Sequence, residues 1–350
     1  CSTCEHIREC RNCPVYSYLE HRDYSRKVQY LCDITEASKK YAANYMENHQ
    51  KIFEIGGLII CVRSDLPIRP DTFHTKFEKF LSPSDHTAAD VFITHSFSLP
   101  DTTSLKPSEQ VYDKRPWKIY RKGNSYIYLG KSVDADHIPP HQVLVCNQDH
   151  TSCRVYNASE AHFTRGGLNS IAMLPSDQIL LSRALVNHGG LFIHSSGVII
   201  HDKGCLFVGN STAGKSTISE FLMKDHLLLC DDRNIVRQKD GIFTLYGTWS
   251  HGDITSVNPD SAPLHGVFFL IKSNKNHITE ITDRKIILEK LLTCIIKPLT
   301  DPTWWHSILD IVEELIVSTP FYNLEFDKSG AIVKTIESFC KSKDHGPNIA

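Results

Sequence analysis

The chain has 350 residues, of which 41% are hydrophobic and 22% are charged, and its formal net charge is −2. This length allows two domains with cores of their own. The near-neutral charge argues against a dedicated nucleic-acid-binding or membrane-surface protein, and no run of 18 apolar residues suits a membrane-spanning helix. There is no signal peptide and the first residue is Cys, so we expect a piece of something longer.

Cysteines are concentrated at the start of the chain. Five of the twelve fall in the first tenth: Cys1, Cys4, Cys10, Cys13 and Cys32. Thiolates at these spacings can converge on one Zn²⁺ ion or one iron–sulfur cluster. The other cysteines are scattered, several of them in apolar runs where a reduced Cys acts as a small hydrophobe. This distribution predicts a cytoplasmic protein with one local metal site, not a disulfide framework.

The first half of the chain changes from helical to strand-like patterns. Residues 34–49 are polar and helical in pattern. Four segments rich in Ile, Val, Tyr and Phe follow, separated by polar connectors that contain proline, and we expect strands there: 53–62, 90–98, 117–129 and 142–156. Gly123 and Asn124, between two alternating runs, indicate a hairpin turn.

The second half alternates between helices and strands. We expect a helix over 174–188, ended by Gly189 and Gly190, and then paired strands at 191–194 and 197–201. A buried strand is expected at 227–230, and residues 241–278 are strand-like. The segments 285–297 and 308–317 are helical in pattern, and 341–350 have the composition of a frayed tail.

The segment 204–216, GCLFVGNSTAGKS, combines a short buried strand, the spacing Gly-x4-Gly-Lys-Ser and a helical pattern from about Ser216. This is the phosphate-binding P-loop in its strand–turn–helix context. Lys215 would reach the outer phosphates of ATP and the Ser216 hydroxyl would hold Mg²⁺. A chance glycine turn is the alternative. The nucleotide contacts are expected from Gly209, Asn210, Ser211, Thr212, Ala213, Gly214, Lys215, Ser216 and Thr217.

Two acidic residues, Asp231 and Asp232, follow the strand at 227–230, and ligands gather at the carboxyl ends of strands in such sheets. One carboxylate could share Mg²⁺ with Ser216, and the other could accept a proton from an incoming hydroxyl. We place Asp232 with Ser216 as a metal ligand and keep both aspartates, with His194 and Lys215, as candidate catalytic residues. Which aspartate is the base stays open. The alternative for the two aspartates is that they only open a turn. The alternative for His194 is a purely structural role.

These pieces resemble the HPr kinase/phosphorylase family and related small serine kinases, whose P-loop core is akin to that of phosphoenolpyruvate carboxykinase. The resemblance covers roughly 53–339 and is carried by HSSGVII (194–200), GNSTAGKST (209–217) and LLLCDD (227–232), with GTWSHGD (247–253) and APLHGVFFL (262–270) further on. It implies an α/β P-loop kinase core with a β-rich accessory domain. It also implies a homo-oligomer that transfers the γ-phosphoryl group of ATP, with Mg²⁺, to a serine of a protein or peptide.

The chain departs from this family at two points. Thr212 stands where the bacterial members have a loop glycine, and the segment linked to the reverse, phosphorolysis reaction has no convincing copy here. A one-way kinase is therefore expected. The segment with Trp249, His251 and Asp253 either lies near the nucleotide or the acceptor hydroxyl, or forms a β-turn with a half-buried Trp.

The cysteine cluster and the helical segment after it resemble the end of a SPASM domain, the iron–sulfur extension of radical S-adenosylmethionine peptide-modifying enzymes. The resemblance implies that Cys1, Cys4, Cys10 and Cys32 share a [4Fe–4S] cluster, that Cys13 belongs to a second cluster, and that a radical S-adenosylmethionine enzyme is a partner. The family more often has three residues before the fourth cysteine. Nothing resembles the radical enzyme's own cluster motif, so residues 1–50 would be a remnant. A structural zinc knuckle is the alternative.

We therefore expect four parts: a cysteine-rich fragment (1–50), a β-rich accessory domain (51–175), a P-loop kinase domain (176–340) and a disordered tail (341–350). The predicted activity is that of an ATP-dependent serine kinase in a peptide-modification pathway. The alternatives are a nucleotide-binding switch or ATPase without an acceptor and a metal-bearing peptide-binding module. A carboxykinase would need an arginine cluster, and the arginines are scattered.

Overall fold

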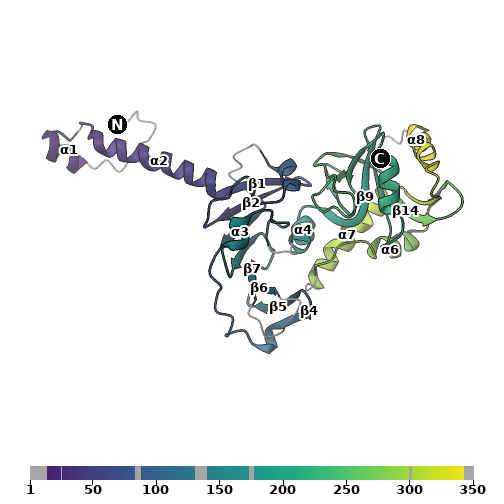
Figure 1. The fold of residues 1–350 in the computed structure, drawn as a ribbon, viewed down its shortest axis with the longest axis horizontal. Helices are drawn as coiled ribbons and strands as arrows, with labels where there is room; N and C mark the ends of the chain where they lie inside the picture. The colour runs from purple at the N-terminus through teal and green to yellow at the C-terminus, as the bar shows by residue number, and fades with distance from the viewer. Residues whose placement is uncertain are drawn as a thin grey trace.

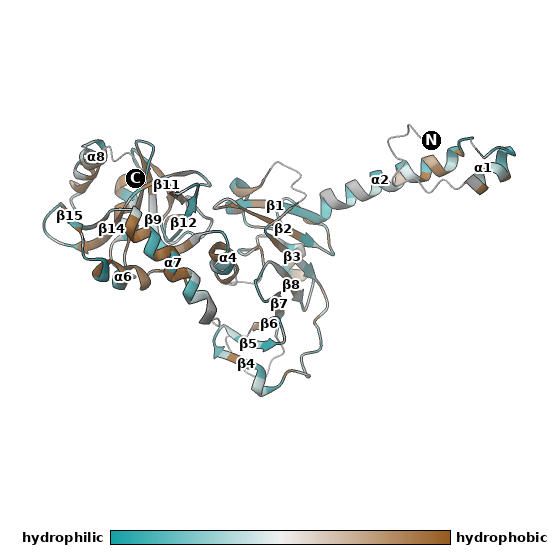
Figure 2. Ribbon diagram, turned by 180° about the vertical axis from the view of Figure 1, so that it is seen from behind, coloured by the Kyte–Doolittle hydropathy of each residue, from teal (hydrophilic) through white to brown (hydrophobic). Residues whose placement is uncertain are grey.

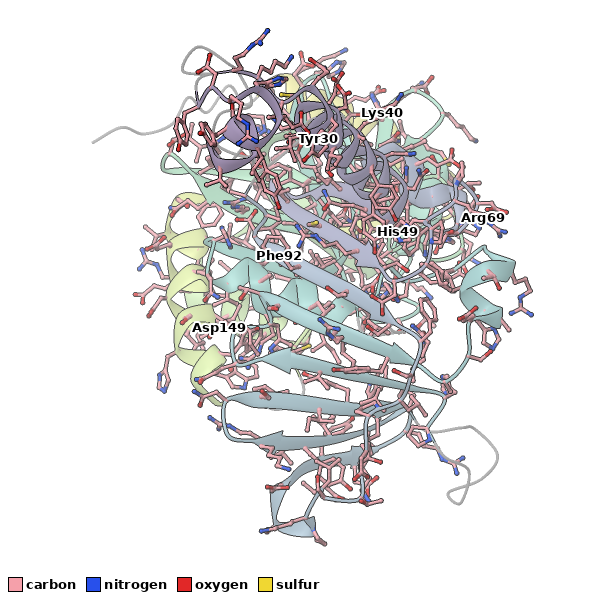
Figure 3. The ribbon with its side chains drawn as sticks, turned by 90° about the vertical axis from the view of Figure 1, so that its left-hand side faces the viewer. Tyr30, Lys40, His49, Arg69, Phe92 and Asp149 are labelled. Carbon is pink, nitrogen blue, oxygen red and sulfur yellow. The ribbon has the colours of Figure 1, made fainter. Side chains whose placement is uncertain are left out.

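The computed structural model describes residues 14–24, 26–82, 88–130, 140–172, 177–298 and 302–342. It is a mixed α/β structure with two large mixed sheets, and helices α1 (Pro14–His21) and α2 (Gln29–His49) project from the first sheet as an arm (Figure 1). Figure 3 looks along this arm, with Tyr30, Lys40 and His49 labelled on α2. Of the helices in the described part of the chain, none combines the length and the hydrophobicity that crossing a membrane requires.

The first sheet has the strand order β1-β2-β3-β8-β7-β6-β5-β4, in which β2, β3 and β8 are parallel neighbours and all other pairs are antiparallel. Its strands are β1 (Gln50–Ile55), β2 (Leu58–Ser64), β3 (Val91–Ser96), β4 (Gln110–Lys114), β5 (Trp117–Lys122), β6 (Ser125–Gly130), β7 (Gln142–Asn147) and β8 (Ser152–Asn157). The connections include the 3-10 helices η1 (Thr75–Phe80) and η2 (Pro107–Glu109) and helix α3 (Ala161–Arg165).

Turn residues divide the strand-like segments of the first half more finely than expected. The hairpin at Gly123 and Asn124 is confirmed, because β5 and β6 are joined there by two residues. The single strand expected over 53–62 is wrong: Gly56 and Gly57, both at positive φ, turn the chain between β1 and β2. The segment 142–156 likewise contains the two antiparallel strands β7 and β8.

The second sheet contains β10, the strand that leads into the P-loop. Its main path is β10-β9-β12-β13-β14-β16-β15, with β11 paired to β9 and β10 also paired to β14. The strands are β9 (Gly190–Ile200), β10 (Lys203–Val208), β11 (Leu227–Cys230), β12 (Arg233–Lys239), β13 (Ile242–Tyr246), β14 (Ser261–Lys272), β15 (His277–Ile281) and β16 (Phe321–Phe326). The helices are α4 (Asp177–Val186), α5 (Lys215–Leu222), α6 (Arg284–Leu292), α7 (Pro302–Ser318) and α8 (Ile332–Ser342).

Strand β9 corrects another expectation. The paired strands at 191–194 and 197–201 are wrong, because β9 runs unbroken through the two serines between them. Both serines are buried and satisfied: the Ser195 hydroxyl donates to the carbonyl of Ile193, and the Ser196 and Ser219 hydroxyls lie 2.6 Å apart. Polar residues with internal partners need no turn to reach solvent.

The two sheets share a core. One cluster of buried apolar side chains contains residues of the first sheet, half of α4, and Phe192, Ile235 and Trp249 from the second part of the chain. Figure 1 shows α4 between the two sheets, and Figure 2 shows hydrophobic residues gathered in the strands of the second sheet and in α7. The four-part division stays a prediction, with its boundary at residue 176 falling just before α4.

Candidate active site

The P-loop begins where β10 ends and runs directly into α5. Close contacts explain both of its glycines. A Cβ on Gly209 would lie 2.6 Å from the Cβ of Ala213, and one on Gly214 would lie 2.7 Å from the ring of Phe326. Gly214 also has a φ of 109°, a conformation that favours glycine. The strand–turn–helix context expected from the sequence is present, and the loop packs against the end of β16.

Lys215 lies inside this loop, in the first turn of α5. Its Nζ donates hydrogen bonds to the carbonyl oxygens of Gly209 (2.8 Å) and Asn210 (3.2 Å). Burial lowers the pKa of Lys215, and the nearby carboxylate of Asp232 opposes that shift. A lysine in this position carries its charge to the place where the loop's N–H groups would hold a phosphate.

The Ser216 hydroxyl pairs with a carboxylate that comes from a distant segment. It donates a hydrogen bond of 3.0 Å to Oδ2 of Asp253. Adjacent ligands of an octahedral Mg²⁺ lie about 3 Å apart, because each is about 2.1 Å from the ion. Such sites use one or two protein oxygens and complete the shell with water and substrate phosphates. The pair Ser216 and Asp253 therefore has the chemistry to hold Mg²⁺. The expected partner of Ser216, Asp232, is paired with His194 and Arg233 instead, so its role as a metal ligand stays a prediction.

Asp231 is buried and holds the segment that carries Asp253. Its Oδ1 accepts a hydrogen bond from the backbone N–H of Gly252 (2.7 Å), and its Oδ2 accepts one from that of Ile254 (2.9 Å). Two N–H donors satisfy a buried carboxylate well. Asp231 thus fixes the backbone on both sides of Asp253.

Asp232, the next residue, has different partners. Its Oδ1 lies 3.1 Å from Nε2 of His194 on β9, and its Oδ2 pairs with the guanidinium of Arg233. Burial alone would raise the pKa of Asp232, but the His194 hydrogen bond and the positive charge of Arg233 outweigh it and lower that pKa. Asp232 is therefore ionised at neutral pH and can accept a hydrogen bond from a substrate hydroxyl.

A cleft of about 480 Å³ brings these groups together. Most of the sequence-predicted residues line it: Ser211, Thr212, Gly214, Lys215, Ser216, Thr217, His194, Asp231 and Asp232. The other three loop residues support it, since the Gly209 and Asn210 carbonyls hold Lys215 and Ala213 packs on Gly209. The roles assigned to these residues stay predictions.

The cleft also contains residues that sequence reasoning did not select. The sequence patterns mark Asp253 only as part of the segment 247–253, and they mark neither Lys272 nor Lys328. Each lysine ends or closely follows a buried strand, β14 or β16. A lysine at the end of an apolar run or within two residues of it is the signal that could have found them.

The segment 247–253 contributes one residue to the core, Trp249, and one to the cleft, Asp253. Trp249 is 1% exposed and packs among Phe53, Phe77 and Phe80, so it is neither half-buried nor at the cleft. His251 is partly exposed, and its Nδ1 lies 3.1 Å from the carbonyl oxygen of Gly252. Of the three residues weighed in this segment, Asp253 alone lines the cleft.

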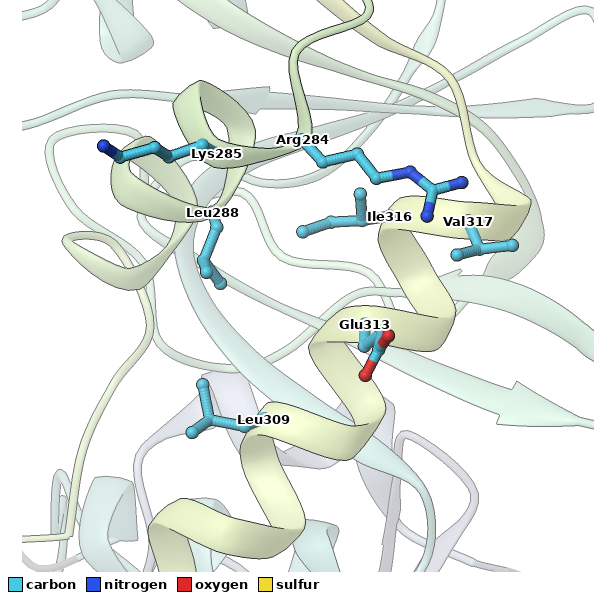
Figure 4. A pocket seen from close by; sticks show the side chains of 7 residues that line it. All are labelled: Arg284, Lys285, Leu288, Leu309, Glu313, Ile316 and Val317. Carbon is cyan, nitrogen blue, oxygen red and sulfur yellow. The ribbon is translucent and has the colours of Figure 1, made fainter.

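A second cleft, of about 310 Å³, lies between α6 and α7 (Figure 4). Its lining is mainly aliphatic, with Leu288, Leu309, Ile316 and Val317, and it contains no residue of the P-loop. The residues predicted to bind ATP therefore line the cleft beside α5 and not this one.

The predicted cysteine site falls almost wholly outside the described residues, which is where Cys1, Cys4, Cys10 and Cys13 lie. Cys32 is described: it is a partly exposed free thiol on α2. Across the described ranges, no three His, Cys, Asp or Glu side chains converge on a metal site. The iron–sulfur cluster, the zinc alternative and the SPASM resemblance stay predictions.

Comparisons with known proteins add little to this site. No protein family matches the chain, and no curated protein matches it. Among solved structures, the Hpr(Ser) kinase/phosphatase from Coxiella burnetii is similar over 43% of this chain and 93% of its own, with 12% identity and a TM-score of 0.27. A TM-score this low carries no argument about function.

Proposed function

We propose that the protein is an ATP-dependent kinase that transfers a phosphoryl group to a serine of a protein or peptide. One observation carries the proposal: a P-loop lysine, a hydroxyl–carboxylate pair and a histidine–carboxylate pair line the same cleft. A nucleotide-binding switch needs only the first two. The His194–Asp232 pair adds a group able to accept a proton from an incoming hydroxyl.

The loop and its neighbours would bind and orient the nucleotide. The backbone N–H groups at the start of α5 and the Lys215 ammonium would hold the phosphates. Ser216 and Asp253 would hold Mg²⁺, and the ion would supply positive charge that offsets the negative charge developing on the phosphates. Asp231 would act as a positioning residue through its bonds to Gly252 and Ile254.

Asp232 would orient the acceptor hydroxyl and take its proton as the oxygen attacks the γ-phosphorus. The bond from the γ-phosphorus to the bridging oxygen would break, and ADP would leave with that oxygen. His194 would hold the Asp232 carboxylate in place through the 3.1 Å contact. A lowered pKa makes Asp232 a weak base, which suits phosphoryl transfer because positioning and electrostatics dominate its catalysis.

The test separates binding from transfer. Calorimetry with Mg-ATP should show binding to the wild type and its loss in Lys215→Ala, with Lys224→Ala, at an exposed lysine beyond α5, as the matched control. Asp253→Asn should weaken binding of ATP in the presence of Mg²⁺ while leaving Mg²⁺-free binding unchanged. Asp232→Asn should keep ATP affinity and lower phosphorylation of a serine peptide library by about 10² or more.

Two results would contradict this proposal. If calorimetry detects no binding of Mg-ATP to the wild-type protein, a working P-loop is excluded. Wild-type protein that releases phosphate from ATP at the same rate with and without peptides, and labels none of them, would indicate an ATPase or switch.

A further inference from the structure

Two lysines of the cleft are not used by the proposed chemistry. Lys272 is the last residue of β14, and Lys328 lies two residues after the end of β16. Both side chains are exposed and both line the cleft with the P-loop residues. They are 56 positions apart in the chain, so only the fold brings them to one place.

Sheet topology explains why they meet. Strands β10, β14 and β16 are consecutive parallel neighbours, so their carboxyl ends lie at one edge of the sheet. The P-loop follows β10, Lys272 ends β14, and Lys328 follows β16. The Phe326 ring packs against Gly214 and joins the end of β16 to the loop. The cation pair therefore stands beside the phosphate-binding loop.

The turn that carries Lys328 is held in place. Oδ1 of Asp327 accepts hydrogen bonds from the backbone N–H and the hydroxyl of Ser329, and the backbone N–H of Asp327 donates to Oδ1 of Asn276 (3.3 Å). The two hydrogen bonds from Ser329 to the Asp327 carboxylate also lower the pKa of Asp327. Asp327 and Ser329, which flank Lys328, are thus bonded to each other, and Asn276 in the β14–β15 connection holds Asp327. These bonds fix the backbone at Lys328.

Charge distinguishes these lysines from the other cleft residues. Each carboxylate that lines the cleft already has a partner described above, and Lys215 is bonded to loop carbonyls. Among the described residues, neither Lys272 nor Lys328 forms an ion pair or a side-chain hydrogen bond. Two unpaired cations beside an anion-binding loop favour a ligand with more negative charge than the loop alone can hold.

We propose that Lys272 and Lys328 bind the terminal phosphate of a nucleoside triphosphate, so that the cleft prefers triphosphate to diphosphate. This inference rests on the proposed function, because it assumes that the P-loop holds the inner phosphates. An acidic acceptor peptide is a different ligand for the same cations. Their place in the same cleft as the P-loop residues favours the phosphate.

The experiment measures the affinities of Mg-ATP, Mg-ADP and Mg-tripolyphosphate by calorimetry. Lys272→Ala and Lys328→Ala should each weaken ATP and tripolyphosphate about tenfold, the loss of one charge-assisted hydrogen bond, and change ADP affinity less than twofold. Lys272→Arg and Lys328→Arg should stay within threefold of the wild type. Lys275→Ala, an exposed lysine three residues beyond Lys272, should match the wild type. Thermal melting would confirm that each variant is folded.

The outcomes separate the two proposals. Equal losses for ATP and ADP, or no loss for either in variants of a wild type that binds both, would overturn the inference and leave the proposed function standing. Unchanged ATP affinity with a raised KM for an acidic peptide would overturn it in favour of acceptor binding. A wild type that binds neither nucleotide would overturn both proposals.

Discussion

Thr212 is the residue at which the P-loop departs most from a glycine-rich loop. It has a φ of 71°, in the left-handed region that β-branched residues rarely adopt. The sequence already marks this position as a departure from the family that the loop resembles, which has glycine there. The structure gives the physical reason: the backbone at residue 212 has the conformation that glycine adopts without strain.

Replacement of Thr212 by glycine should therefore relieve backbone strain at this position. We expect Thr212→Gly to raise the free energy of unfolding by up to about 1 kcal/mol, since the left-handed conformation costs a non-glycine residue about 1–2 kcal/mol and glycine entropy offsets part of the gain. Thr212→Ala keeps the Cβ and is the matched control. Urea denaturation measures both, and equal stabilities of the Gly and Ala variants would contradict the strain.

Among the elements, β3 carries a titratable group into the core. His95 is 1% exposed, its Nε2 donates to the carbonyl of Ile171 (2.9 Å), and its ring lies 5.2 Å from that of Phe163. Burial lowers the pKa of His95 to about 4, although the Ile171 bond opposes that shift. The folded protein therefore keeps this imidazole neutral.

This burial predicts a loss of stability in mild acid. Between pH 6.5 and 4 the unfolded chain binds a proton at His95 that the folded chain does not, so the free energy of unfolding falls as pH falls. The contribution of His95 between pH 7.5 and 5 should be about 2 kcal/mol. Urea denaturation at both pH values, compared with His95→Gln, measures it. The same pH dependence in the variant and the wild type would assign the effect to other groups.

At the scale of the whole molecule, Trp249 joins the two sheets. It belongs to the segment that carries Asp253, yet its ring lies among Phe53, Phe77 and Phe80 of the first part of the chain. The accessory sheet and the P-loop sheet thus depend on one shared core. We therefore expect loss of this contact to weaken Mg-ATP binding at the Asp253 end of the cleft.

We expect Trp249→Ala to lower the free energy of unfolding by about 3–5 kcal/mol, the usual cost of truncating a buried Trp. Calorimetry should show one unfolding transition for the wild type and two for this variant, with weaker Mg-ATP binding. Trp305→Ala on α7, which is partly exposed, is the matched control and should keep one transition. A single transition in Trp249→Ala with a cost below about 1 kcal/mol would show that the sheets are not coupled through this residue.

The P-loop, the helix that follows it and the acidic pair after β11 could all be predicted from the sequence. These features are contiguous in the chain, and local backbone preferences, glycine positions and apolar runs specify them. The hairpin at Gly123 was predictable for the same reason. The unbroken course of β9 was not, because a serine pair signals a turn unless hidden partners such as Ser219 satisfy it.

The tertiary structure alone decided which distant groups share the cleft. Ser216 meets Asp253 across 37 positions, and Lys272 and Lys328 meet through the parallel pairing of β10, β14 and β16. The burial of Trp249 in the core of the first sheet could not be predicted from the sequence either. Strand pairing and core packing depend on the free energy of contacts between segments far apart in the chain, which no local pattern records.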